Sequence, residues 1–165
     1  MRTSEKVILL YLQARLWSGK KFFGSLGPSV TRVSGCRVNK GPCESAEIEA
    51  ERYVAQRTSI PVPKVYHTYQ VDGRFYVEME YVKGDTLQAL WASGALSPDE
   101  KKALVMQVAG YIDQLRMLKP PHKEIVASAD LGRCLDYRVG YRPLGPFTSN
   151  EEFHPFLRGY IHSAG

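Results

Sequence analysis

Hydrophobic positions between residues 46 and 57 recur at helical spacing, and this stretch organises the rest of the chain. Ala46, Ala50, Tyr53 and Val54 fall on one face of a helix, and no helix-breaking residue precedes Arg57. The pattern therefore predicts a helix that begins near residue 46 and ends near Arg57.

The pattern then changes to that of a strand pair. Two prolines after Ile60 disfavour helical backbone for the residues before them, so the chain leaves the helix extended. Largely β-branched or aromatic residues follow in Lys64–Val71, and Phe75–Met79 reads as a second strand. Asp72 and Gly73 suit the two positive-φ positions of a type I′ turn, so we expect an antiparallel hairpin.

The residues before this stretch predict one helix and three short strands. An amphipathic helix fits Thr3 to Trp17, with Thr3 or Ser4 as its cap and Gly19-Lys20 as its end. Three strands are predicted at Lys21–Phe23, Val30–Val33 and Cys36–Lys40.

The residues after the hairpin predict a connector, Glu80–Lys83, and then helices. Asp85 suits the cap of a short helix that carries Leu87, Leu90 and Trp91. A stronger start signal is the capping box Ser97-Pro98-Asp99-Glu100, followed by apolar residues on one helical face as far as about Leu118. A last helix is predicted from Ser149 or Asn150 through Tyr160.

Together these elements predict an α+β fold. Strands with one crossing helix precede Gly84, and helices with loops follow it. We expect an antiparallel sheet of about five strands, and two units, residues 1–83 and residues 84–165.

Composition and charge narrow the function classes. The chain has 165 residues, of which 44% are hydrophobic and 24% charged, and this is a globular composition. The net charge of +5 favours anionic ligands in a general way, but the basic residues are scattered, so we expect no nucleic-acid partner.

The cysteines and the first apolar run point to a cytoplasmic protein. Cys36, Cys43 and Cys134 are odd in number and lack histidines at metal-ligand spacing, which favours reduced thiols over disulfides or zinc. The run Val7–Leu12 resembles a weak signal peptide, but no small-residue cleavage site follows it, and it is too short to span a membrane. We therefore expect neither secretion nor a membrane partner.

Candidate chemistry centres on Lys40 and Glu47. A carboxylate near the start of the predicted helix could pair with Lys40, and a lysine so held can bind a polyphosphate. Glu51 lies one turn further on the same face and is an alternative partner, while two solvated surface groups are the plainer alternative. The glycines at 24 and 27 could let backbone N–H groups approach a phosphate, although an ordinary hairpin turn is the favoured interpretation.

The order of these elements matches that of a kinase small lobe entering its large lobe. The sequence resembles the aminoglycoside phosphotransferase family as it occurs in fungi, a branch of the protein-kinase-like fold. The matching pieces are KGP at Lys40, EIEAERYVAQRTSIPVPKVY from Glu47, FYVEMEYVKGDTLQALW from Phe75, LSPDEKKALVMQVAGYIDQLRMLKPP from Leu96 and GPFTSNEEFHPFL from Gly145.

The resemblance implies a nucleotide site. Lys40 would contact the α and β phosphates of ATP, and Glu47 would orient Lys40. The backbone of Glu80, Tyr81 and Val82 would meet the adenine edge, as an unpaired connector can. Asn39 departs from the family, which usually has an apolar residue there, and the residue 24–27 turn is a poor match.

The family's catalytic groups are absent from these 165 residues. Neither a His-Gly-Asp loop followed by an Asn nor a later metal-binding Asp occurs, and Asp130-Leu131-Gly132 matches a non-catalytic segment of the family. Since phosphoryl transfer in this fold depends on such groups, we expect weak ATP binding at most, no held Mg²⁺ and no catalysis by this piece alone.

Two functions of different classes stay open from the sequence. One is a shortened, amino-terminal part of a small-molecule phosphotransferase, and the other is a non-catalytic module whose kinase-like lobe binds a nucleotide or a protein partner. An unrelated α+β domain with the same layout is a third, weaker alternative. A missing part of the large lobe would uncover an apolar surface and favour self-association or a partner. The residues expected on that surface are Ile112, Leu115, Phe153 and Phe156.

Overall fold

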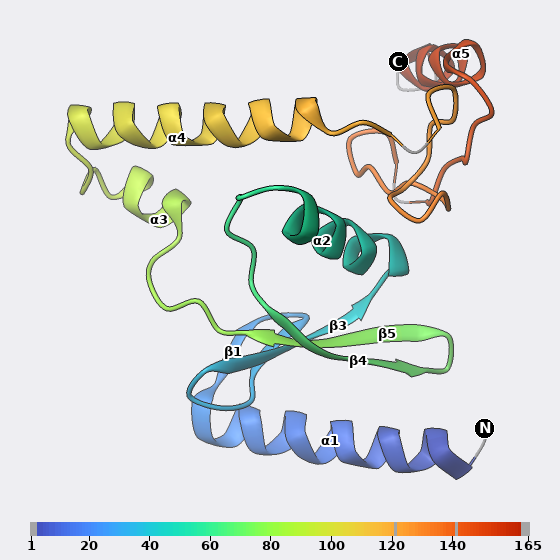
Figure 1. The fold of residues 1–165 in the computed structure, drawn as a ribbon. Helices are drawn as coiled ribbons and strands as arrows, with labels where there is room; N and C mark the ends of the chain where they lie inside the picture. The colour runs from blue at the N-terminus through green and yellow to red at the C-terminus, as the bar shows by residue number, and fades with distance from the viewer. Residues whose placement is uncertain (1–2, 121, 141, 163–165) are drawn as a thin grey trace.

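The computed structural model describes residues 3–120, 122–140 and 142–162, and it shows an α+β fold (Figure 1). The helices are α1 (Thr3–Phe23), α2 (Ser45–Arg57), α3 (Leu87–Ala92), α4 (Pro98–Met117) and α5 (Asn150–His162). The strands are β1 (Ser25–Gly27), β2 (Val30–Arg32), β3 (Arg37–Cys43), β4 (Val65–Val71) and β5 (Arg74–Glu80). The α+β prediction is confirmed, whereas the division at residue 83 stays a prediction.

The five strands form one antiparallel sheet in the order β1-β2-β3-β5-β4. Its most regular part is the predicted hairpin of β4 and β5. Asp72 and Gly73 have φ values of 49° and 72°, as a type I′ turn requires. The predicted sheet and hairpin are therefore confirmed.

Helices cover both faces of this sheet (Figure 1). On the inner face, α2 packs its Ile48 against Val38, Val77 and Met79 of the sheet, and these four residues form a small core. On the outer face, α1 lies along β2 and β4 and buries Leu12. The sheet is thus the middle layer of three, and each of its faces carries a different kind of contact.

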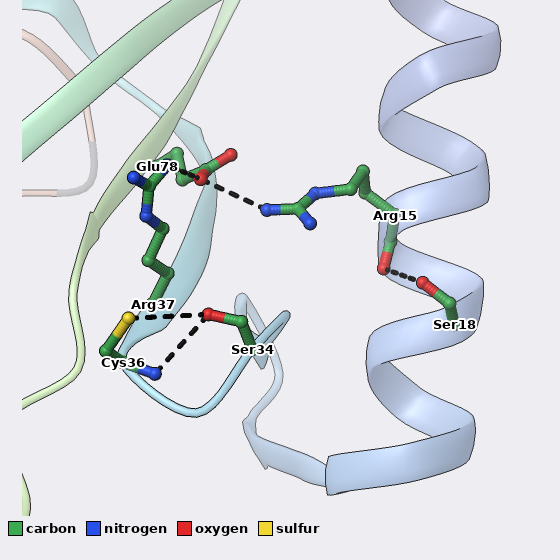
Figure 2. A network of polar contacts seen from close by, with 6 residues as sticks. All are labelled: Arg15, Ser18, Ser34, Cys36, Arg37 and Glu78. Atoms are coloured by element: carbon green, nitrogen blue, oxygen red, sulfur yellow. Dashed lines mark hydrogen bonds and ion pairs between the residues drawn. The ribbon is translucent and has the colours of Figure 1, made fainter.

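The outer face carries a buried ionic contact (Figure 2). Glu78 Oε1 accepts hydrogen bonds from Arg15 of α1 at 3.1 Å and from Arg37 of β3 at 2.8 Å. Asn39 and Thr31 are buried on the same face, because antiparallel pairing places Asn39 beside both Thr31 and Glu78. Asn39 Oδ1 has no hydrogen-bond partner among the described residues.

Helix α1 is longer than the sequence predicts. It runs through Gly19-Lys20 to Phe23, so the strand predicted at Lys21–Phe23 is wrong, and β1 begins at Ser25 instead. A Cβ at Gly19 would lie 2.5 Å from the carbonyl oxygen of Arg32, so this glycine permits close helix–strand contact and does not end the helix. The cap predicted at Thr3 or Ser4 lies outside the described side chains.

Strand β3 also passes its predicted end. It continues beyond Lys40 to Cys43, with an irregular register against β5 between those two residues. Gly41 has a φ of 152° and approaches Tyr76 so closely that a Cβ would lie 2.6 Å from its ring. Lys40 therefore lies within the strand, just before an irregularity that only glycine accommodates.

The helices after the sheet follow the sequence with one correction. Thr86, and not Asp85, caps α3, because its side chain accepts a hydrogen bond from the N–H of Ala89. The capping box of α4 is formed by Ser97 and Glu100, as predicted. No helix in the described part of the chain is long and apolar enough to cross a membrane.

The segment between α4 and α5 is irregular and folds against itself. Two isolated bridges, Val126 with Phe147 and Cys134 with Leu144, hold it together. The rings of Phe153 and Phe156 pack 5.2 and 5.0 Å from that of Phe147. Phe153 and Phe156 are partly buried in this packing, so they are less exposed than expected.

Candidate functional site

The two residues singled out from the sequence meet on the inner side of the sheet. Lys40 of β3 donates a hydrogen bond from Nζ to Oε1 of Glu47 in the first turn of α2. The strand directs Lys40 towards α2 because neighbouring residues of a strand alternate between faces, and Asn39 points to the other one. The predicted pairing of Lys40 with Glu47 is therefore confirmed, while its use by a nucleotide stays a prediction.

The charges around Lys40 keep it protonated. Burial by itself lowers the pKa of Lys40, but the hydrogen bond and charge of Glu47 and the charge of Glu51 raise the pKa above its ordinary value. Burial raises the pKa of Glu51, and Lys40 opposes this rise. Glu51 thus lies within electrostatic reach of Lys40, but Glu47 is its hydrogen-bond partner.

A cavity of about 720 Å³ opens beside this ion pair. Its first wall comes from Lys40 and Cys43 of β3, Glu47 of α2 and Ser29 of the turn between β1 and β2. The second wall comes from the irregular segment between α4 and α5. The residues of that second wall are Ser128, Ala129, Cys134, Leu135, Tyr137 and Pro143.

The lining combines charged, hydroxyl and thiol groups. Among the described residues that line the cavity, Lys40 is the one basic residue, and Glu44 and Glu47 are the two acidic residues. Burial, helped by the charge of Glu47, raises the pKa of the Cys43 thiol to about 11. Burial also raises the pKa of Cys134. Both thiols are therefore protonated near neutral pH and act as small apolar groups in the wall.

The connector at residues 80–82 does not line this cavity. The N–H of Glu80 donates to the carbonyl of Lys64, and the N–H of Tyr81 donates to that of Cys36, both at 2.9 Å. The premise that the connector's N–H groups are unpaired is therefore wrong for these two residues, because β5 continues its pairing through them. The side chain of Val82 is exposed.

Sequence reasoning missed most of the cavity lining. Ser29 gave a weak signal, because it lies in the turn whose glycines were considered for phosphate contact. The second wall gave none, because Ser128 and Tyr137 are almost a hundred residues from Lys40 and no local pattern predicts such a contact. Their place depends on how the irregular segment folds back towards α2 (Figure 1).

The turn at Asp130-Leu131-Gly132 has a local role. Asp130 Oδ1 accepts hydrogen bonds from the Ser128 hydroxyl and, at 3.2 Å, from the Gly132 N–H. These bonds lower the pKa of Asp130 and stabilise the positive φ of 62° at Leu131. Within the described residues, no group of three or more histidine, cysteine or acidic side chains is placed to hold a metal ion.

Comparison with known proteins gives a partial likeness to a kinase. The chain is 28% identical over 102 residues to the serine/threonine-protein kinase PknD of Mycobacterium tuberculosis, in strains CDC 1551 and H37Rv. The match covers 57% of this chain and 15% of PknD. No family model matches the chain, and no solved structure matches it significantly. These findings support, at most, a distant kinase-like relationship for part of the chain.

Proposed function

We propose that this chain is the nucleotide-binding part of a kinase-like protein of the aminoglycoside phosphotransferase type. Lys40 binds the phosphates of ATP, and Glu47 holds the lysine in place for them. The observation that carries this proposal is the Lys40–Glu47 ion pair at the side of a cavity of about 720 Å³. A cavity of that size is within the range of small-molecule sites.

The charge balance of the site predicts weak binding. A polyphosphate entering the cavity is attracted by Lys40 and repelled by Glu44 and Glu47. Ser29 adds a hydroxyl donor from the turn between β1 and β2. We expect a dissociation constant on the order of 1 mM for ATP, which corresponds to about 4 kcal/mol of binding free energy.

The chain binds a nucleotide without transferring phosphate in this proposal. The 165 residues carry no His-Gly-Asp loop, and the described residues hold no acidic cluster for Mg²⁺. Positioning and neutralisation of charge supply nearly all of the catalysis in phosphoryl transfer. Purified chain given radiolabelled ATP and hydroxylated acceptors is expected to transfer no label.

Isothermal titration of ATP into wild type, Lys40→Ala and Lys102→Ala chains tests the site. Removing Lys40 is expected to weaken binding about tenfold, because one phosphate-bound charge is typically worth about 1.4 kcal/mol. Lys102 is an exposed lysine of α4 and serves as the matched control with unchanged binding. Equal affinity of wild type and Lys40→Ala would reject the nucleotide site.

One observation favours a second function, a non-catalytic module that binds a protein. Helix α4 exposes large apolar side chains on more than one of its sides, and the described chain does not cover them. They are Val105, Met106, Val108, Ile112, Leu115 and Met117. Polar contacts such as the Gln114 side chain with Ser59 attach α4 without burying these side chains. Ile112 and Leu115 are 42% and 43% exposed, and we propose that a second copy or another protein covers them.

Sedimentation of the wild type and of Met106→Ser/Ile112→Ser distinguishes the two functions. If α4 is an interaction surface, the wild type self-associates or captures its partner and the double variant does not, whereas ATP binding is unchanged. A monomeric wild type with Lys40-dependent ATP binding supports the nucleotide site alone.

A further inference from the structure

Helix α1 is apolar on the side that faces away from the protein. Val7, Leu10 and Trp17 are 61%, 65% and 65% exposed. With Ala14 and Lys21 they follow one another at intervals of three and four residues, which places them on one face. The apolar part of this face, Val7 to Trp17, extends about 15 Å along the helix.

The opposite face of α1 is unusually polar for a helix packed on a sheet. This face buries Leu12, but it also places Arg15 against the buried carboxylate of Glu78. The ring centroids of Tyr11 and Tyr69 lie 6.0 Å apart on the same face. A surface helix normally turns its polar side chains to water. In α1, large apolar side chains occupy that place, and Figure 1 shows α1 as the outermost layer.

The most exposed charges on α1 have one sign, because the one acidic residue of the helix, Glu5, is half-buried. In residues 5–23 of the helix, whose side chains the structure describes, the exposed charged residues are Lys6, Lys20 and Lys21. Lys21 lies 5.0 Å above the ring of Trp17 and 5.9 Å above that of Phe22. The apolar face therefore ends in a cluster of aromatic and lysine side chains.

We propose that the outward face of α1 binds the surface of an anionic lipid bilayer. Leucine, valine and tryptophan enter the boundary between headgroups and acyl chains, and the three lysines meet the lipid phosphates and carboxylates, as in interfacial helices. A second copy of the chain fits less well, because pairing two α1 helices on this face brings lysines of one towards lysines of the other. The expectation of no membrane partner depended on the length of the apolar run, which excludes a span but not a helix lying in the surface.

Vesicle flotation of the full chain tests this proposal. The wild type is expected to float with vesicles of phosphatidylcholine and phosphatidylserine. A much smaller fraction of the protein is expected to float with pure phosphatidylcholine vesicles. Replacing Lys20 and Lys21 by glutamate is expected to weaken binding at least tenfold, and added salt to weaken it further. Leu10→Ser/Trp17→Ser is expected to abolish binding, although both residues are exposed and the fold is retained.

Two controls keep the result specific to α1. Val105→Ser/Met106→Ser removes exposed apolar groups from α4 and is expected to leave vesicle binding unchanged. In Trp91→Phe chains, Trp17 is the one remaining tryptophan, so its emission is expected to shift to shorter wavelength with anionic vesicles. Circular dichroism checks that each variant is folded.

Three outcomes would overturn the proposal. The first is absence of binding to anionic vesicles, and the second is equal binding to both vesicle types. The third is a chain that binds no vesicles but self-associates, with Leu10→Ser/Trp17→Ser abolishing the self-association. That outcome would show that α1 binds another protein chain and not a membrane. ATP titration is independent of every one of these measurements, so the nucleotide proposal stands or falls separately.

Discussion

The two faces of the sheet hold ionic contacts of opposite character. On the outer face, the side chain of Glu78 is 3% exposed and one of its oxygens receives two arginines. On the inner face, Lys40 and Glu47 are 31% and 39% exposed and bind each other beside a cavity. Figure 2 shows Arg15 reaching the outer carboxylate from α1 and Arg37 reaching it from β3. The difference indicates that the first contact holds the fold together and the second is accessible to a ligand.

The largest expected difference between the faces is in stability. Glu78→Ala is expected to lower the free energy of unfolding by about 2 to 3 kcal/mol, because two arginines lose a shared, buried acceptor. Glu47→Ala is expected to cost less than about 1 kcal/mol, as is usual for a half-exposed pair. Urea unfolding of both variants measures the two values, and equal losses would contradict the comparison.

The buried carboxylate itself could not be predicted from the sequence. Glu78 alternates with apolar residues in FYVEMEYV, but nothing local shows that Arg15 and Arg37 reach it from a helix and another strand. By contrast, the hairpin and the capping box depend on residues close together in the chain, and the sequence predicts them. The pairing of Lys40 with Glu47 is also local, but the residues alone left Glu51 and two solvated groups as alternatives, and the family resemblance selected Glu47. The role of Gly19 could not be predicted from the sequence either. Gly19 allows α1 to approach the backbone of Arg32 closely, and nothing within the helix indicates that contact.

The second expected difference is that the two faces lose stability at opposite ends of the pH range. Burial by itself raises the pKa of Glu78, but the hydrogen bond from Arg37 and the charge of Arg15 outweigh it and lower the pKa. Its contribution is therefore present above the unfolded pKa of about 4.3 and is lost as the pH falls through the lower folded value. The pKa of Lys40 is raised, so its contribution is complete below about pH 10.4 and is lost as the pH rises through the folded value.

Urea midpoints across pH separate these two effects. The stability difference between wild type and Glu78→Gln is expected to shrink as the pH falls from about 6 to about 3. The difference between wild type and Lys40→Met is expected to shrink only on the alkaline side, above about pH 10. A Glu78→Gln difference that is constant throughout the acid range would show that the carboxylate is not held by its arginines.

The smallest expected difference is in the reactivity of one cysteine on each side. Cys36 is exposed in the turn before β3, where its Sγ lies 3.8 Å from the Ser34 hydroxyl (Figure 2). Cys43 lines the cavity, and burial with the nearby charge of Glu47 raises its pKa to about 11. Only about one Cys43 in a thousand is then a thiolate at about pH 8, and the thiolate is the nucleophile.

Iodoacetamide is expected to modify Cys36 at least about tenfold faster than Cys43, as measured by peptide mass spectrometry, and urea is expected to remove the difference. Equal rates in the folded chain would mean that the cavity wall around Cys43 is open to water, and the inner ion pair would then belong to an ordinary solvated surface.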